Sequence, residues 1–489
     1  MASGDPTPDG VVLWTRVSVA ALERVDVAWT VAADEALAEP VASGSVRATP
    51  DGDHTVHVTV SGLEPETTYW YRFAVGDKAS VVGRTKTLPA PDGPPGRLRL
   101  GVVCYAHYAT GYFNAYARLA ERDVDLVVHL GDYIYEAEAK RNKWTRFHRP
   151  RGRCLTLPDY RARHGQYKTD PDLQRLHARH PMVAVWDDHE LAGNAWWDGA
   201  AGHDRWADGD WTFRREAAVR AYREWVPSRL GDPANPFRIW RTVRLGPLAD
   251  LLLLDTRLAG REAPASDRRP VLGVRRRRDR ALLDPAQWEW LESQLAGPGP
   301  RWTVVASQVV VAPIHLLAAG GALGRRLGAV GGGLVVNSGQ WDGYPAERER
   351  LLALLRRRRG GVLVLSGDLH SSWVSQLAAD DGRAEPLAPE FTVPAVSAPS
   401  FARTLVPQVR GARSVLETVI RRANPHVAWV DTASHGYVVL DVTPERIEGQ
   451  WWHVERVGRR TDGERLAVTW MVMPGDPRPL QGGAAPGRP

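Results

Sequence analysis

The feature that most limits the fold of this chain is a series of short apolar runs that alternate with helical patterns. Six such runs follow residue 96, at 97–104, 124–130, 182–186, 249–255, 302–308 and 361–367. Helical segments lie between them at 113–123, 211–226 and 285–296. Strands that are apolar on both faces are typical of sheets covered by helices. The sequence therefore predicts an α/β layer fold here, with a β-like pattern returning from 389 to 473.

The first 87 residues instead predict β structure alone. Four segments rich in β-forming side chains are separated by Gly-, Pro- and Asp-rich turns, at 11–17, 25–33, 54–63 and 68–75. Strands at this spacing, with no alternating helix, favour a small β-sandwich. The Pro- and Gly-rich stretch Leu88–Gly96 can continue neither pattern. We therefore expect an N-terminal β-sandwich at 1–92, an α/β domain at 93–475, and a disordered tail at 476–489.

Charge and cysteine content narrow the class of protein. The net charge of +6 comes mainly from arginine and would suit an anionic partner. The two tightest clusters, Arg275–Arg278 and Arg356–Arg359, are interpreted as a solvated helix end and its flanking loop, with no nucleic-acid-binding signature beside them. Two cysteines cannot build a disulfide framework, so stability must come from the core. With no apolar run of membrane-spanning length and no signal peptide pattern, the chain as written is expected to be cytoplasmic. We also expect a monomer.

Residues of metal-binding types follow four of the six apolar runs. They are Cys104 after the first run, Asp132 and Tyr135 after the second, Asp187 to Glu190 after the third, and Asp368 and His370 after the sixth. The run at 249–255 leads into Asp255-Thr256-Arg257. One Asp after a strand carries little weight, since Asp is common in turns. Because ligands gather beyond the carboxyl ends of strands in α/β sheets, four such loops predict a shared site.

These residue types suit the hydrolysis of phosphate esters. A phosphate ester is anionic and repels nucleophiles, whereas two or three adjacent cations neutralise it and supply a metal-bound hydroxide. A carboxylate between two cations can bridge them, which is the role that we assign to Asp132. A thiolate and a phenolate on one ion favour a softer, trivalent metal, while oxygen ligands suit Ca²⁺, Mg²⁺ or Mn²⁺.

Most of these residues also have a structural interpretation. Cys104 could be a small buried residue, and this interpretation is the favoured one for Cys154. Tyr133 and Tyr135 could both be packing residues, and only the spacing favours Tyr135 as a ligand. The run Asp187–Glu190 could cap a helix N-terminus. Four further histidines are interpreted as structural or surface residues: His107, His129, His148 and His315.

Six motifs occur in a fixed order along the chain: ASGDPTPDGVVLWTR, LGDYIYE, VWDDHE, LLLLDTR, QWDGYPAER and SGDLHSSW. Together they resemble the alkaline phosphatase D (PhoD-like) family of the calcineurin-like metallophosphatase superfamily, from Ala2 to about Val457. The resemblance implies an immunoglobulin- or fibronectin-like β-sandwich followed by a metallophosphatase αββα sandwich. It also implies a hydrolase that acts on phosphate mono- or diesters at alkaline pH.

The same resemblance implies individual roles. Fe³⁺ would be held by Cys104, Asp132, Tyr135 and His370, and Ca²⁺ (or Mn²⁺, Mg²⁺ or Zn²⁺) by Asp132, Asp188 and Asp368. Asp188 replaces the ligand Asn of the superfamily, and Asp368 replaces a ligand His. Asp132 and His189 would be catalytic, with His189 as leaving-group acid or phosphate contact. His189 and Arg257 would bind the substrate, a small-molecule or polymeric phosphate ester.

The chain departs from the family pattern at two places. The Asp that usually precedes the Gln-Trp-Asp-Gly-Tyr stretch is replaced by Asn337-Ser338-Gly339, and no counterpart of a further His ligand is apparent. Family members are usually exported by the twin-arginine route, so the protein would be secreted or periplasmic if a leader precedes this sequence.

Two other functions stay open on the sequence alone. A strict phosphodiesterase acting on phospholipid head groups, teichoic acids or nucleic acid ends would need the same metals and differ only in its pocket walls. An inactive protein that binds a surface polymer through its β-domain is an alternative of another class. The retained metal-ligand residues argue against this last alternative.

Overall fold

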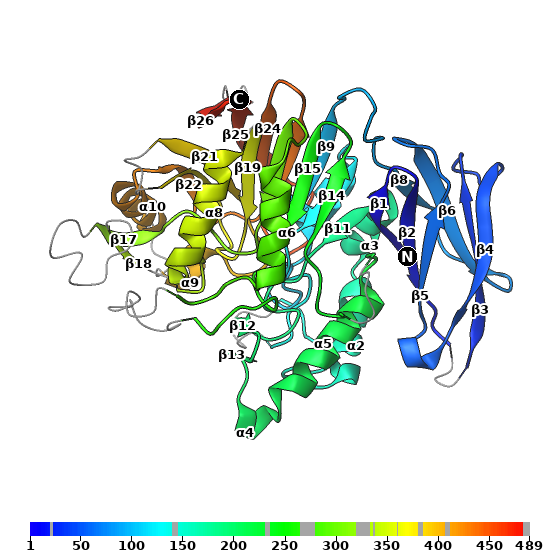
Figure 1. Cartoon of the computed structure of the whole chain (residues 1–489). Coiled ribbons are helices and arrows are strands. Elements are labelled where there is room, and N and C mark those ends of the chain that lie inside the picture. Colours follow the sequence, from blue (N-terminus) through cyan, green and yellow to red (C-terminus); the bar gives the residue numbers. More distant parts are fainter. Residues whose placement is uncertain are drawn as a thin grey trace.

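The structure is a computed structural model that describes residues 1–19, 23–138, 145–229, 235–264, 279–318, 333–335, 338–358, 360–379, 385–405 and 411–482. Figure 1 shows the N-terminal strands, in blue, beside a larger α/β body. Among the described residues, no helix is both long and apolar enough to span a bilayer.

The α/β body is built on two sheets. The first has the strand order β26-β25-β24-β23-β9-β10-β11-β1-β2-β5, and the second has the order β14-β15-β16-β19-β21-β20-β22. The bounds of the strands in the body are β9 Leu98–Val103, β10 Leu126–His129, β11 Met182–Ala184, β14 Arg241–Leu245, β15 Ala249–Leu253, β16 Trp302–Ala306, β19 Gly361–Ser366, β20 Ser372–Ala378, β21 Pro386–Thr392, β22 Val427–Asp431, β23 Gly436–Val442, β24 Ile447–Val454, β25 Glu464–Met473 and β26 Asp476–Gln481. All six predicted apolar runs are strands, namely β9, β10, β11, β15, β16 and β19.

Alternate residues of these strands pack on opposite sides. Leu251 and Leu253 of β15 belong to the core that contains the strands of the first sheet. Leu252 belongs to a second core, together with Trp288 of α6 and Leu351 of α8. Because side chains alternate along a strand, an entirely apolar strand can serve both cores. Helices α6 and α8 thus cover one face of the second sheet (Figure 1), and the predicted layered α/β fold is confirmed.

Five of the described helices, namely α2, α3, α4, α5 and α6, begin at a side chain that caps their first turn. The bounds of the helices are α1 Asn114–Ala120, α2 Leu157–Lys168, α3 Pro171–Arg179, α4 Arg205–Asp208, α5 Trp211–Trp225, α6 Pro285–Ala296, α8 Pro345–Arg357, α9 Phe401–Leu405 and α10 Ala412–Ala423. Asp210 and Asp284 accept hydrogen bonds from the first turns of α5 and α6, as N-cap side chains do. The three predicted helical segments are therefore confirmed as α1, α5 and α6.

The N-terminal region forms two sheets around its own core. Its strands are β1 Ala2–Thr7, β2 Gly10–Arg16, β3 Val25–Ala32, β4 Pro40–Ala48, β5 Thr55–Ser61, β6 Thr68–Val75, β7 Lys78–Ala79 and β8 Gly83–Lys86. Buried side chains such as Val27, Val58 and Tyr71 form this core. However, β1 pairs in parallel with β11 at Gly4 and Met182, so β1, β2 and β5 extend the first sheet of the body.

Two sequence-based expectations change. Residues 476–481, expected to belong to the disordered tail, form β26 and pair with β25. The β-like region from 389 to 473 also contains α9 and α10. Arg356 and Arg357 lie in the last turn of α8, as expected for a helix end, while Arg275–Arg278 and Asn337 lie outside the described residues.

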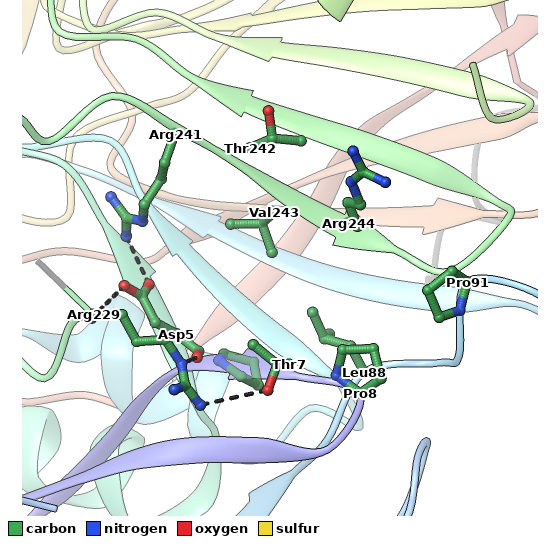
Figure 2. Close-up of a pocket in the computed structure, with 11 residues that line it drawn as sticks. Asp5, Thr7, Pro8, Leu88, Pro91, Arg229, Arg241, Thr242, Val243 and Arg244 are labelled. Atoms are coloured by element: carbon green, nitrogen blue, oxygen red, sulfur yellow. Dashed lines mark hydrogen bonds and ion pairs between the residues drawn. The ribbon is translucent and has the colours of Figure 1, made fainter. Parts of the chain in front are cut away.

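A buried aspartate joins the N-terminal strands to the body, beside a hollow of about 290 Å³. Figure 2 shows Asp5 of β1 between Arg229 and Arg241. Asp5 Oδ1 accepts from Arg241 Nη2 at 2.6 Å, and Asp5 Oδ2 accepts from the Arg229 amide at 2.7 Å. The Asp5 side chain is 5% exposed, and Arg241 is its ion-pair partner.

Replacing Asp5 with asparagine should lower the urea midpoint of unfolding, because Arg241 loses its carboxylate partner. Breaking a buried pair costs about 3–5 kcal/mol, and the 18% exposure of Arg241 brings our expectation to roughly 2–3 kcal/mol. Asparagine tolerates the φ of 39° at this position, so the change tests the charge. Asp9→Asn, at an exposed residue, is the control. Equal midpoints for the two variants would contradict the prediction.

Candidate active site

The candidate site lies where the loops after β9, β10, β11, β15 and β19 meet. Three of its residues, Asp132, Asp368 and His370, have left-handed backbones with φ of 53°, 60° and 51°. Such conformations cost on the order of 1–3 kcal/mol each and are concentrated at functional sites. Gly131 has φ of 107°, and a Cβ there would lie 2.5 Å from Asp187. The strand-end loops therefore turn sharply and place their polar side chains side by side.

Asp132 is the buried centre of the cluster. Its Oδ1 accepts from the His189 amide at 3.0 Å, and its own amide donates to Glu190 Oε2 at 3.0 Å. Burial, opposed by His189 but reinforced by Asp188 and other acids, raises the pKa of Asp132 well above its usual range. A nearby cation would stabilise the ionised form of Asp132 and so keep it a carboxylate.

Glu190 orders the two loops around Asp132. Its Oε1 accepts from the Tyr133 amide at 2.6 Å, and its Oε2 also accepts from the Asp187 amide at 2.8 Å. Burial raises the pKa of Glu190 to about 8, against these backbone hydrogen bonds. The Asp-Asp-His-Glu run is therefore not a helix cap in this structure, since no helix begins there among the described residues.

Arg257 binds the carboxylates of the site. Its Nε donates to Asp187, its Nη2 donates to Asp368 Oδ1 at 2.6 Å, and Nη2 lies 3.4 Å from Asp188 Oδ1. Arg257 is completely buried, so its expected contact with substrate stays a prediction. Burial raises the pKa of Asp187 to about 7, although Arg257 acts to lower it. Burial would also raise the pKa of Asp188, but Arg257 and His189 hold it below its ordinary value.

Tyr135, His370 and Cys104 come from three different loops. Tyr135 Oη lies 3.2 Å from His370 Nε2, and the other ring nitrogen of His370 contacts the Pro399 carbonyl at 3.0 Å. Cys104 is buried, and its Sγ lies 3.5 Å from the Pro394 carbonyl. Burial, and then the charge of Asp132, raises the pKa of both the Cys104 thiol and the Tyr135 phenol well above the usual range. Both would bind a metal only in the deprotonated form, which the metal itself would have to stabilise.

His189 has a carboxylate behind its ring. Nδ1 of His189 lies 2.7 Å from Glu136 Oε2, and the other oxygen of Glu136 accepts from the Gly193 amide at 2.8 Å. Burial alone would lower the pKa of His189, but Glu136, Asp188 and Asp132 raise it well above its usual value. The His189 side chain is 26% exposed, so it can reach a bound molecule.

Two groups of carboxylate and histidine atoms lie close enough to hold cations. One is Asp132, Asp188 and His189, the other is Asp187, Asp188 and Asp368, and the ligand atoms of each group lie within 4.8 Å of one another. The four acids of these two groups lie beside one arginine, Arg257, and one histidine, His189, so added positive charge would relieve the repulsion. The carboxylate common to both groups is Asp188, not Asp132, so the bridging role expected of Asp132 stays a prediction.

Sequence reasoning missed several supporting residues. Glu136 follows directly in the LGDYIYE motif, but nothing in the sequence pairs it with His189. Gln340 donates to the second carboxylate oxygen of Asp368. His107, expected to be structural, packs on Tyr135 with ring centroids 4.2 Å apart. The Cys154 amide donates to the Glu136 carbonyl at 2.9 Å, while its Sγ lies 3.6 Å from the Asp159 carbonyl.

Two sheets whose strand-end loops bring acidic and histidine side chains together fit the phosphoesterase class of enzymes. The PhoD-like phosphatase model matches residues 100–451, and the model of the PhoD-like phosphatase N-terminal domain matches residues 1–89. The chain belongs to the PhoD-like phosphatase family and is a phosphate ester hydrolase.

Two relatives support the same conclusion. The chain is 34% identical over 463 residues to alkaline phosphatase D of Bacillus subtilis (strain 168), covering 91% of this chain and 75% of the relative. It is also similar to a solved structure described as PhoD, with a TM-score of 0.87 and 32% identity, covering 99% of this chain and 91% of that chain.

Proposed function

We propose that the Asp132 cluster hydrolyses phosphate esters with two metal ions. Cys104, Asp132, Tyr135 and His370 would hold Fe³⁺, while Asp132, Asp188 and Asp368 would hold Ca²⁺, with Mn²⁺, Mg²⁺ or Zn²⁺ as substitutes. The observation that carries the proposal is the convergence of donor atoms from separate strand-end loops, with Tyr135 Oη 3.2 Å from His370 Nε2. A thiol, a phenol, an imidazole and a carboxylate suit a trivalent ion, whereas the carboxylate group suits Ca²⁺.

Different residues of this chain would have different roles in the reaction. When bound, the ions would neutralise the phosphate and supply a hydroxide nucleophile. His189, charged through Glu136, would donate a proton to the leaving oxygen. Asp132 holds the His189 amide at 3.0 Å, so the acid and the bridging carboxylate are fixed relative to each other. Three properties stay predictions: whether the enzyme uses monoesters or diesters, where the protein is located, and whether it is a monomer.

Elemental analysis of protein purified without chelator tests the proposal, coupled to hydrolysis of para-nitrophenyl phosphate and of its bis-ester. We expect bound iron with calcium and activity that is lost to a chelator. A phenolate bound to Fe³⁺ gives a visible charge-transfer band, so Tyr135→Phe should shift or abolish this band. Tyr108→Phe is the control, because Tyr108 packs on Phe113 and Tyr167 rather than on the proposed ligands.

The two substrates also separate the alternatives. Cleavage of the bis-ester alone would indicate a strict phosphodiesterase. Protein with no metal and no hydrolysis after reconstitution would contradict the proposal.

A further inference from the structure

Arg257 contacts two of the carboxylates that would hold the proposed second cation, those of Asp188 and Asp368. Its Nη2 is 2.6 Å from Asp368 Oδ1 and 3.4 Å from Asp188 Oδ1. Its Nε is bonded to Asp187, which belongs to the same carboxylate group. One guanidinium therefore joins three acids that would otherwise repel one another in a buried site.

The backbone at Arg257 is held in place from both sides. Asp255 Oδ1 accepts from the Arg257 amide at 2.8 Å and from the Leu258 amide at 2.9 Å. Gln287 pairs with Asp255, accepting from its amide at 2.8 Å and donating to its carbonyl at 3.0 Å. Because these bonds fix the loop after β15, the guanidinium is aimed at the carboxylates by the fold itself.

We propose that Arg257 is a built-in counter-ion of the second cation site, which holds Asp188 and Asp368 together and competes with the second cation for their oxygens. This inference rests on the two-ion function proposed above. Arginine stays charged at every accessible pH, so the competition cannot be relieved by deprotonation. The affinity for the second cation is then set by Arg257 as well as by its ligands, which would make Arg257 a positioning residue rather than a catalytic one.

The chain offers a matched control in Arg261. It is also buried, but its Nη1 donates to the Thr256 carbonyl at 2.8 Å and its Nη2 to the Gly339 carbonyl at 2.9 Å. Replacing Arg261 removes a buried arginine of the same loop whose guanidinium donates to two carbonyls rather than to carboxylates. The two arginines therefore separate loss of packing from loss of competing charge.

The experiment compares Arg257→Gln and Arg261→Gln in the full chain. After chelator treatment and restoration of iron, Ca²⁺ binding is measured by calorimetry, and urea unfolding is measured without Ca²⁺. Both variants should unfold at lower urea. Arg257→Gln should also bind Ca²⁺ at least about tenfold more tightly, since the positive charge in contact with the carboxylates is gone. Arg261→Gln should change the affinity by a much smaller factor, since Arg261 donates to carbonyls and acts on Asp368 and Asp187 only from a greater distance.

An unchanged or weakened Ca²⁺ affinity in Arg257→Gln would overturn the inference. If that variant does not fold, Arg257→Lys decides, because its single ammonium holds the carboxylates less well. Its affinity for Ca²⁺ should rise in the same direction by a smaller factor, and no rise would overturn the inference. If parent and variants all bind no divalent cation, the proposed function itself fails, and the inference fails with it.

Discussion

Asp132→Asn is expected to abolish hydrolysis and to release the bound metal, while the protein stays folded. Metal-ion catalysis is worth several kcal/mol, so kcat/KM should fall by about 10³-fold or more. Asp132 has a left-handed backbone with φ of 53°, which asparagine adopts readily. The amide oxygen can still accept from the His189 amide, as Asp132 Oδ1 does at 3.0 Å. The substitution therefore removes one charge and little else.

The measurement is metal content and activity on the same preparation. Asp123→Asn is the control, since the side chain of Asp123 is 90% exposed and its ion pair with Arg99 is long, at 4.0 Å. Full activity with full metal in Asp132→Asn would show that the bridging role is wrong. Loss of activity with metal retained would instead indicate that Asp132 positions His189.

The sheet and the strand-end residues could be predicted because they depend on local pattern. A short apolar strand such as β10 can be recognised in the sequence without knowing which strands it pairs with. The loop after it turns at a glycine, and Asp132 and Tyr135 follow at fixed spacing. A general rule, that sites lie beyond the carboxyl ends of strands, then brings loops together that lie far apart in the chain.

The parts that could not be predicted depend on long-range pairing. The parallel contact of Gly4 with Met182 joins residues almost 180 positions apart, so nothing local shows that β1 extends the first sheet. Arg257 illustrates the same limit at the site. Its type suggests contact with a phosphate, but three carboxylates from two other loops surround it. Burial decides between these uses of an arginine, and burial is a property of the folded chain.

Replacing His189 with glutamine is expected to slow the hydrolysis of esters with poor leaving groups by about 10²–10⁴-fold. An alkyl alcohol must be protonated as it leaves, whereas para-nitrophenolate leaves unaided, so para-nitrophenyl phosphate should lose far less. The comparison of an alkyl phosphate with the nitrophenyl ester therefore reports on the acid alone. Equal losses on both substrates would contradict a proton-donating role and favour a phosphate contact.

Glu136→Gln tests how the acid stays protonated at alkaline pH. A general acid works only in its protonated form, and Glu136 is the strongest of the charges that raise the pKa of His189. Removing that charge lowers the pKa of His189, so the alkaline limb of the pH–rate profile for the alkyl ester should move to lower pH. Glutamine keeps the shape of Glu136 and can still accept from the Gly193 amide, now 2.8 Å away.

Glu121→Gln, at a side chain that is 50% exposed at the end of α1, should leave the profile in place. An unmoved limb in Glu136→Gln would mean that some other group donates the proton, because the charge of His189 depends on this carboxylate more than on any other.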